Sequence, residues 1–132
     1  LAQLYKWPFR QHTRTQNAMH FRDLFESKPW CRIQKIIGRS SWFTVGIVLD
    51  GVLKGRRSEV ITALDQAGIQ NRPLASRNFL KQPVMRDLDY IDNHDYSAAD
   101  DIHDNGFFVG NGSEDIRHHL DNMYEVITKF TE

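Results

Sequence analysis

The chain has a single cysteine, Cys31, so it cannot build a disulfide framework of its own. A lone cysteine fits a reducing compartment, and we expect a cytoplasmic protein. The longest apolar run, residues 42–49, is far shorter than a membrane span. Seventeen basic residues balance seventeen acidic ones, which gives a formal net charge of zero. Because nucleic-acid-binding domains normally have a basic excess, we expect neither nucleic acid nor membrane as a partner.

Motifs for metal binding, phosphate binding and nucleophilic catalysis are also missing from the sequence. Three aspartates, Asp87, Asp89 and Asp92, resemble the start of a calcium loop, but Ile91 then occupies a position that needs an oxygen ligand. Cys31 has no neighbouring signature of activation, and a lone cysteine usually serves as a small buried apolar residue. The sequence has no glycine-rich phosphate loop and no nucleophile elbow. We therefore assign neither a catalytic residue nor a metal ligand to this chain.

What the sequence does contain is a pattern of apolar residues that predicts an α+β fold. Main helices are expected at residues 11–26, 58–67 and 113–130, and shorter helical segments at residues 84–88 and 98–103. Strands are expected at residues 32–36, 41–49, 69–74 and 107–109. The second strand is almost wholly apolar, which is typical of a central strand covered on both faces. We expect one domain, a small antiparallel sheet packed with helices.

Two residues at the ends of the helix predicted over residues 58–67 have a specific expected role. Ser58 is expected to cap its start, because a serine side chain can accept a hydrogen bond from a free N–H of the first turn. Gly68 is expected to end it in the left-handed conformation. In the first helical region, Pro8 is expected to break or kink whatever precedes it.

A polar segment that follows this helix holds the candidate binding residues. It runs from Gly68 through Pro73 into a loop that ends at Phe79. Arginine offers a rigid fork for a carboxylate or phosphate, and asparagine offers both donor and acceptor for a sugar hydroxyl. The alternative is that Arg72 pairs with a nearby aspartate and Asn78 caps a turn, since most such residues serve the surface. The residue types alone leave both interpretations open.

The same segment carries a recognisable motif, Gly68-Ile69-x-x-Arg72-Pro73, followed by Asn78-Phe79 and Gln82-Pro83. Three more motifs occur in order along the chain: residues 1–4 with Arg14 and Asn17, residues 41–43, and residues 105–111. Together they resemble the sugar aminotransferase/dehydratase family, the DegT/DnrJ/StrS group, which has the aspartate-aminotransferase fold. The correspondence covers nearly the whole chain.

The resemblance implies that residues 1–132 form the C-terminal small domain of a fold-type I enzyme dependent on pyridoxal 5'-phosphate (PLP). Within the family, the sequence of residues 105–111 is similar to that of members that are 3-dehydratases of GDP-linked 4-keto-6-deoxy sugars. The 3-dehydratases of CDP-linked sugars and the sugar aminotransferases are alternatives. Such enzymes serve deoxysugar and O-antigen lipopolysaccharide biosynthesis and work as homodimers. A different alternative is a stand-alone binding module that reuses the small-domain fold without catalysis.

In this family the residue that meets the cofactor, lysine or histidine, belongs to a large domain upstream, so we assign none of the six lysines to PLP. The small domain is expected to supply one wall of the cleft and to be inactive alone. Arg77 occupies a position where the family usually has glycine. Gln70 occupies a position where the dehydratases commonly have glutamate. The residues expected to position the nucleotide-linked deoxysugar are Gln70, Arg72, Ser76, Asn78 and Phe79.

Overall fold

The computed structural model describes residues 2–91 and 95–132, so Leu1 and Asp92, named above, lie outside the described residues. The strands are β1 (Cys31–Ile33), β2 (Thr44–Leu49), β3 (Asn71–Pro73) and β4 (Gly106–Gly110). The helices are α1 (Ala2–Tyr5), α2 (Trp7–Phe25), α3 (Arg57–Gln66), α4 (Ser97–Asn105) and α5 (Arg117–Thr128). Short 3-10 helices lie at Gly51–Leu53, Phe79–Lys81 and Pro83–Asp87. The strands form one antiparallel sheet in the order β1-β2-β4-β3, which confirms the predicted α+β class.

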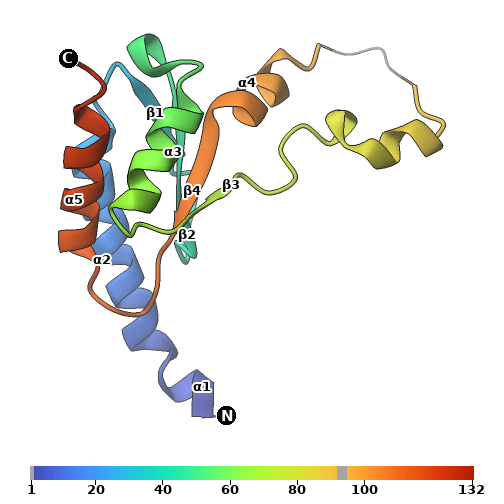
Figure 1. Cartoon of the computed structure of the whole chain (residues 1–132). Helices are drawn as coiled ribbons and strands as arrows, with labels where there is room; N and C mark the ends of the chain where they lie inside the picture. The colour runs from blue at the N-terminus through green and yellow to red at the C-terminus, as the bar shows by residue number, and fades with distance from the viewer. Residues whose placement is uncertain (1, 92–94) are drawn as a thin grey trace.

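One face of the sheet is buried under α2, α3 and α5, and these three helices with the sheet are called the body (Figure 1). Because side chains alternate across a strand, β2 buries Val45, Ile47 and Leu49, each at most 1% exposed. Phe107 of β4 pairs with Ile47 and is fully buried. The helices contribute Phe21, Phe25, Val60, Leu64, Leu120, Met123 and Ile127. Burial of each such side chain stabilises the fold by about 1.5–3 kcal/mol.

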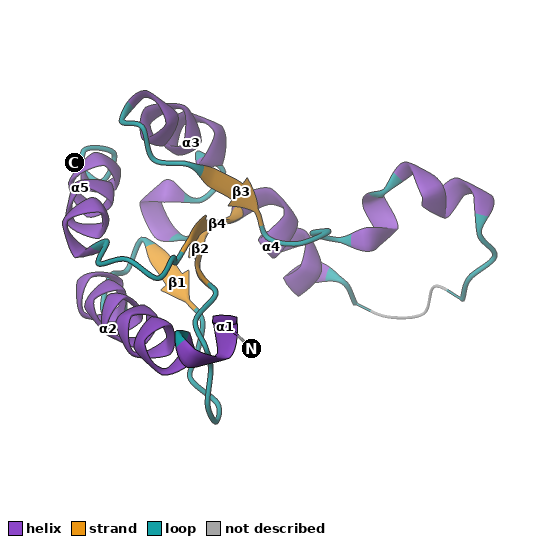
Figure 2. Cartoon of the chain, turned by 90° about the horizontal axis from the view of Figure 1, so that it is seen from below, coloured by secondary structure: helices purple, strands orange, loops and turns teal. Residues whose placement is uncertain are grey.

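The opposite face of the sheet is only partly covered, so the expectation that β2 is covered on both faces is wrong. Its residues on this face, among them Gly46 and Val48, are only half-buried. Helix α4 covers the end of the face near Val48, which pairs with Gly106 (Figure 2). A Cβ on Gly106 would lie 2.5 Å from the backbone oxygen of Ile102, so only glycine permits this close approach of α4. The rest of the face stays open.

The start of α5 differs from the prediction and shows how one helix caps another. The sequence predicts a start at Ser113, but α5 begins at Arg117. Asn17 of α2 donates from Nδ2 to the carbonyl of Glu114 (2.8 Å) and accepts from the N–H of Ile116 at Oδ1 (3.3 Å). The residues before Arg117 therefore bond to α2 and do not continue the helix.

The ends of the other helices follow local rules more closely. Pro8 lies in the first turn of α2, which begins at Trp7, because proline there sacrifices no intrahelical hydrogen bond. The separate short helix α1 precedes it, as a break at Pro8 predicts. Ser58 lies inside the first turn of α3 and does not cap it, because the N-cap position is Arg56, two residues earlier than predicted. Gly68 has a φ of 74° and ends α3 as predicted.

Residues 74–91 leave the body as a projecting arm between β3 and α4, and Figure 1 shows it extending away from the sheet. The arm contains two 3-10 helices, of which Pro83–Asp87 matches the predicted helical segment at residues 84–88. Its exposed apolar side chains are Phe79, Val84, Leu88, Tyr90 and Ile91.

In residues 2–91 and 95–132, every helix is too short or too polar to cross a bilayer.

Candidate functional site

The open part of the second sheet face forms a cavity of about 380 Å³, called the sheet cavity. Arg72 of β3 and Phe108 of β4 are paired neighbours in its wall, and Gln70 lies at its edge just before β3. Arg72 forms no ion pair with any residue of the described chain, so the alternative of a local aspartate partner is not realised. Both predicted residues, Gln70 and Arg72, are exposed to solvent.

Arg14 reaches the sheet cavity from α2. Its guanidinium carbon lies 5.6 Å from the centre of the Phe43 ring, which also lines the cavity. The Nε atom of Arg14 is buried and has no hydrogen-bond partner among the described residues. A buried donor without a partner costs about 1–3 kcal/mol. Arg14 is therefore a candidate donor to a ligand, and the site prediction from sequence missed it. The signal was available, because Arg14 belongs to the family motif.

Two buried asparagines hold Arg14 and the far wall of the cavity together. Asn17 is 1% exposed and Asn111 is 2% exposed, and Nδ2 of Asn17 donates to Oδ1 of Asn111 over 3.0 Å. Nδ2 of Asn111 in turn donates to the carbonyl of Arg14 over 2.9 Å. Buried polar groups of this kind are stable only when they are hydrogen-bonded. The pair therefore ties α2 to the turn after β4, and both segments line the sheet cavity.

A second cavity of about 590 Å³ lies in the arm and is called the arm cavity. Ser76 and Phe79, two of the predicted site residues, line it together with Arg77. The structure therefore divides the predicted set, because Gln70 and Arg72 line the sheet cavity instead.

Arg77 has a φ of 58°, in the left-handed region that favours glycine. Its N–H donates to the carbonyl of Leu74 over 2.9 Å and closes a tight turn. A side chain at such a position costs roughly 1 kcal/mol, which gives a physical reason for the glycine usual in the family. Burial and then the charge of Arg77 lower the pKa of Arg57, so these two guanidinium groups repel each other beside the arm.

Asn78 is 5% exposed and lines neither cavity. Its Oδ1 accepts from the N–H of Leu80 over 3.0 Å and so caps the 3-10 helix Phe79–Lys81. Its Nδ2 donates to Oδ1 of Asp100 in α4 over 2.7 Å. The alternative interpretation, in which Asn78 caps a turn, is therefore realised. Contact between Asn78 and a ligand stays a prediction.

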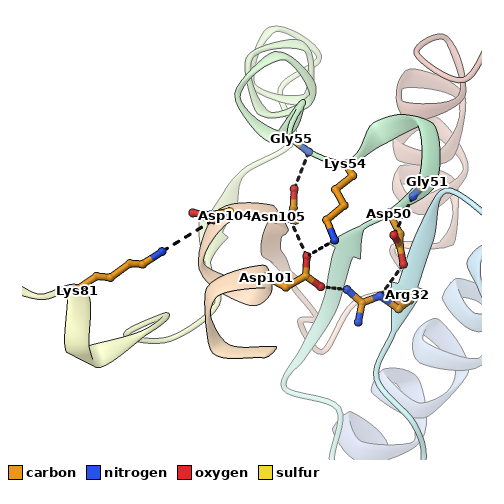
Figure 3. Close-up of polar contacts among 9 residues, drawn as sticks. All are labelled: Arg32, Asp50, Gly51, Lys54, Gly55, Lys81, Asp101, Asp104 and Asn105. Carbon is orange, nitrogen blue, oxygen red and sulfur yellow. Dashed lines mark hydrogen bonds and ion pairs between the residues drawn. The ribbon is translucent and has the colours of Figure 1, made fainter. Parts of the chain in front are cut away.

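Helix α4 is tied to the body by a network of polar contacts around Asp101 (Figure 3). Asp101 accepts from Arg32 of β1 and pairs with Lys54 over 3.2 Å. Asn105 donates to Asp101 over 2.9 Å and accepts from the N–H of Gly55 over 2.7 Å. Burial acts to raise the pKa of Asp101, but the hydrogen bonds from Lys54, Arg32 and Asn105 outweigh it and hold that pKa below its ordinary value.

Cys31 is buried and its thiol is unreactive. Burial raises the pKa of its thiol to about 12, so the nucleophilic thiolate does not form at neutral pH. The interpretation of Cys31 as a small buried apolar residue is confirmed.

Within the described part of the chain, no group of three metal-ligating side chains converges.

Comparison with known proteins identifies the family of the chain. A sequence model for the DegT/DnrJ/EryC1/StrS aminotransferase family matches residues 1–127. The chain belongs to this family. The resemblance drawn from the four sequence motifs is thereby confirmed.

Curated relatives in the family are similar over almost the whole chain. The GDP-4-keto-6-deoxy-D-mannose 3-dehydratase of Yersinia pseudotuberculosis is 35% identical over 130 residues, which are 98% of this chain and 33% of that protein. The enzyme of the same name from Escherichia coli O55:H7 is 33% identical over 131 residues, which are 96% of this chain and 33% of that protein. The chain therefore spans about a third of the length of the curated relatives that it matches.

Solved structures in the family have the same fold. The E. coli GDP-4-keto-6-deoxy-D-mannose-3-dehydratase with bound hydrated PLP superimposes with a TM-score of 0.87 and 32% identity over 95% of this chain and 32% of that chain. A variant of GDP-4-keto-6-deoxymannose-3-dehydratase with bound GDP-perosamine gives a TM-score of 0.88 and 32% identity over 96% and 33%. The Helicobacter pylori aminotransferase PseC, 16% identical with a TM-score of 0.81 over 98% and 35%, shows the fold alone.

No lysine of the described chain lines the sheet cavity or the arm cavity, and lysine is the residue that holds PLP in enzymes of the Schiff-base kind. Lys54 and Lys81 are instead paired with aspartates of α4. The two cavities fit a role in binding and orientation, in which arginine, glutamine and aromatic side chains suffice.

Proposed function

We propose that this chain is the C-terminal small domain of a PLP-dependent nucleotide-sugar 3-dehydratase and that it positions a GDP-linked 4-keto-6-deoxy sugar. The observation that carries the proposal is the 35% identity to a GDP-4-keto-6-deoxy-D-mannose 3-dehydratase across 98% of this chain. Both curated relatives, at 35% and 33% identity, are named 3-dehydratases, so dehydration is favoured over amination. The product would enter deoxysugar and O-antigen lipopolysaccharide biosynthesis in the cytoplasm.

The residues that line the two cavities would bind and orient the substrate. Arg72 presents a guanidinium that forms no ion pair with the described residues, and Gln70 presents an amide, both on the open sheet face. The Nε of Arg14, which also lines this cavity, has no acceptor among the described residues. Arginine binds phosphate or sugar oxygens through a rigid fork of donors. Ser76 and Phe79 extend the same wall into the arm, with Asn78 holding the loop between them. Bond breaking is left to groups of the complete enzyme that this chain does not contain.

Exposed apolar side chains support a place for this chain within a larger assembly. On α1 and the start of α2 they are Leu4, Tyr5, Trp7 and Phe9, and between β1 and β2 they are Ile36, Ile37 and Phe43. Large apolar side chains gathered in this way mark surfaces that contact other protein. In this proposal they meet the large domain and a second subunit of a homodimer, and the isolated chain self-associates through them.

A chimera tests the proposed function. Residues 1–132 replace the corresponding third of the Y. pseudotuberculosis enzyme, and the product is assayed with PLP and GDP-4-keto-6-deoxy-D-mannose. We expect dehydration, and we expect Arg72→Ala to raise KM about tenfold through the loss of charge-assisted hydrogen bonds. Arg39→Ala is the matched control, because Arg39 is exposed and lies outside both cavities.

Two outcomes would contradict the proposal. A folded chimera that holds PLP and neither binds nor converts any nucleotide sugar favours the stand-alone module. Stoichiometric PLP binding by the isolated chain, seen as the visible absorbance of the bound cofactor, would show that the domain assignment is wrong.

A further inference from the structure

Helix α4 carries two adjacent aspartates, Asp100 and Asp101, which bond to different parts of the molecule. Adjacent residues on a helix point about 100° apart, so their side chains can reach different partners. Asp101 bonds to Arg32 of the body and to Lys54. Lys81 approaches α4 from the arm, and Figure 3 shows it beside Asp104, away from the contacts of Asp101. The helix thus connects the arm to the body.

Asp100 makes the contacts on the arm side. Its Oδ1 accepts from Nδ2 of Asn78 over 2.7 Å and pairs with Nζ of Lys81 over 2.8 Å. The hydrogen bonds from Lys81 and then Asn78 lower the pKa of Asp100, so the carboxylate is ionised at neutral pH. Asp104, one turn further along α4, lies 4.0 Å from Lys81 and makes the weaker contact.

The arm has few other supports. Leu74 packs close to Gly46 and Gly106 at its base, but no residue from 75 to 91, all of which the structure describes, belongs to the apolar core. Beyond the base, Gln82 donates to the carbonyl of Ser76 over 2.9 Å, which ties the arm only to itself. The two bonds to Asp100, together with the weaker Lys81–Asp104 contact, join residues 78–81 to α4.

We propose that Asp100 is a positioning residue, which holds Asn78 and Lys81 and thereby fixes residues 76–79 in the geometry that binds the nucleotide sugar. The inference rests on the proposed function for its ligand, since Ser76 and Phe79 are the predicted contacts. Asp100 itself touches no cavity among those described and acts through the loop.

The contacts of Asp100 are expected to affect the order of the arm and not the stability of the whole fold. Both partners of the Lys81–Asp100 pair are more than 40% exposed, and exposed ion pairs contribute little to overall stability. A loop without apolar anchors opens far more easily than the body, so the same contacts can decide its order. Asp100→Ala is therefore expected to loosen the arm without a change in thermal unfolding.

Hydrogen exchange on the 132-residue chain tests the contact itself. The N–H groups of Leu80, Lys81 and Gln82 all bond within the turn that Asn78 caps. We expect them to exchange several-fold faster in Asp100→Ala and to change much less in the matched control Asp104→Ala, because the contact of Asp104 with Lys81 is weaker. Equal exchange in the two variants overturns the proposal, and so does faster exchange spread through β2 and β4.

Kinetics in the chimera test the role. Asp100→Ala should raise KM for GDP-4-keto-6-deoxy-D-mannose several-fold with a much smaller change in kcat, because binding geometry and not chemistry is disturbed. Asp100→Asn keeps an acceptor for Asn78 and should restore part of the loss. A loosened arm with an unchanged KM in an active chimera overturns the positioning role but not the proposed function. An inactive parent chimera counts against the proposed function, and hydrogen exchange then decides on Asp100 alone.

Discussion

The body and the arm of this molecule are ordered by different forces. In the body, apolar side chains such as Phe107 are fully buried between the sheet and three helices. In the arm, apolar side chains such as Phe79 are half exposed, and polar contacts to α4 hold the chain. Burial of apolar surface gives a stable frame, whereas a few polar contacts place the loops that carry function. The sheet cavity has no arm residue in its lining, whereas the arm cavity is lined by arm residues and Pro73.

The sharpest test of this comparison is a phenylalanine-to-alanine change in each region. Phe107→Ala should destabilise the chain by about 3–5 kcal/mol, because it removes a fully buried ring and leaves a cavity in the core. Phe79→Ala, its matched control in the arm, should change the unfolding free energy by at most about 0.5 kcal/mol. Urea unfolding measures both. Similar losses for the two variants would contradict the division into body and arm.

A buried polar contact within the body should have an intermediate effect. Asn17→Ala is expected to destabilise the chain by about 1–3 kcal/mol, since it leaves Asn111 and the N–H of Ile116 without their partner. Gln16→Ala is the control on the same helix, because Gln16 is exposed. Urea unfolding of the two variants gives the difference. If Asn17→Ala unfolds like the control, the cap supplied to α5 by α2 contributes nothing measurable.

The smallest expected effect is a gain in stability within the arm. Arg77→Gly removes a side chain from a backbone with a φ of 58° and should stabilise the chain by up to about 1 kcal/mol. Arg86→Gly, in the same arm but without a positive φ, should stabilise nothing, because glycine there adds only unfolded-state entropy. The midpoint temperatures of thermal unfolding of the two variants are measured and compared. A destabilised Arg77→Gly would show that its guanidinium contributes more than the backbone strain costs.

Much of the fold could be predicted because its signals are local. The apolar run of β2, the periodic apolar face of α5 and the left-handed Gly68 each depend on neighbours within a turn or two. The start of α2 was predicted less well, because the sequence predicts a helix from residue 11 and α2 begins at Trp7. Of the predicted site residues, Arg72 lines a cavity and forms no ion pair within the part of the chain that the structure describes, whereas Asn78 is buried and bonds to Asp100 of α4.

By itself, the sequence determined the α+β class, the order of the elements and the family, since each follows from local periodicity or from motifs read along the chain. Only the tertiary structure decided that α5 begins at Arg117, that Arg14 reaches the sheet cavity, and that Asp100 holds the arm. The physical reason is the separation of the partners. Asn17 and Glu114 are 97 positions apart, and no local pattern records a contact over such a distance.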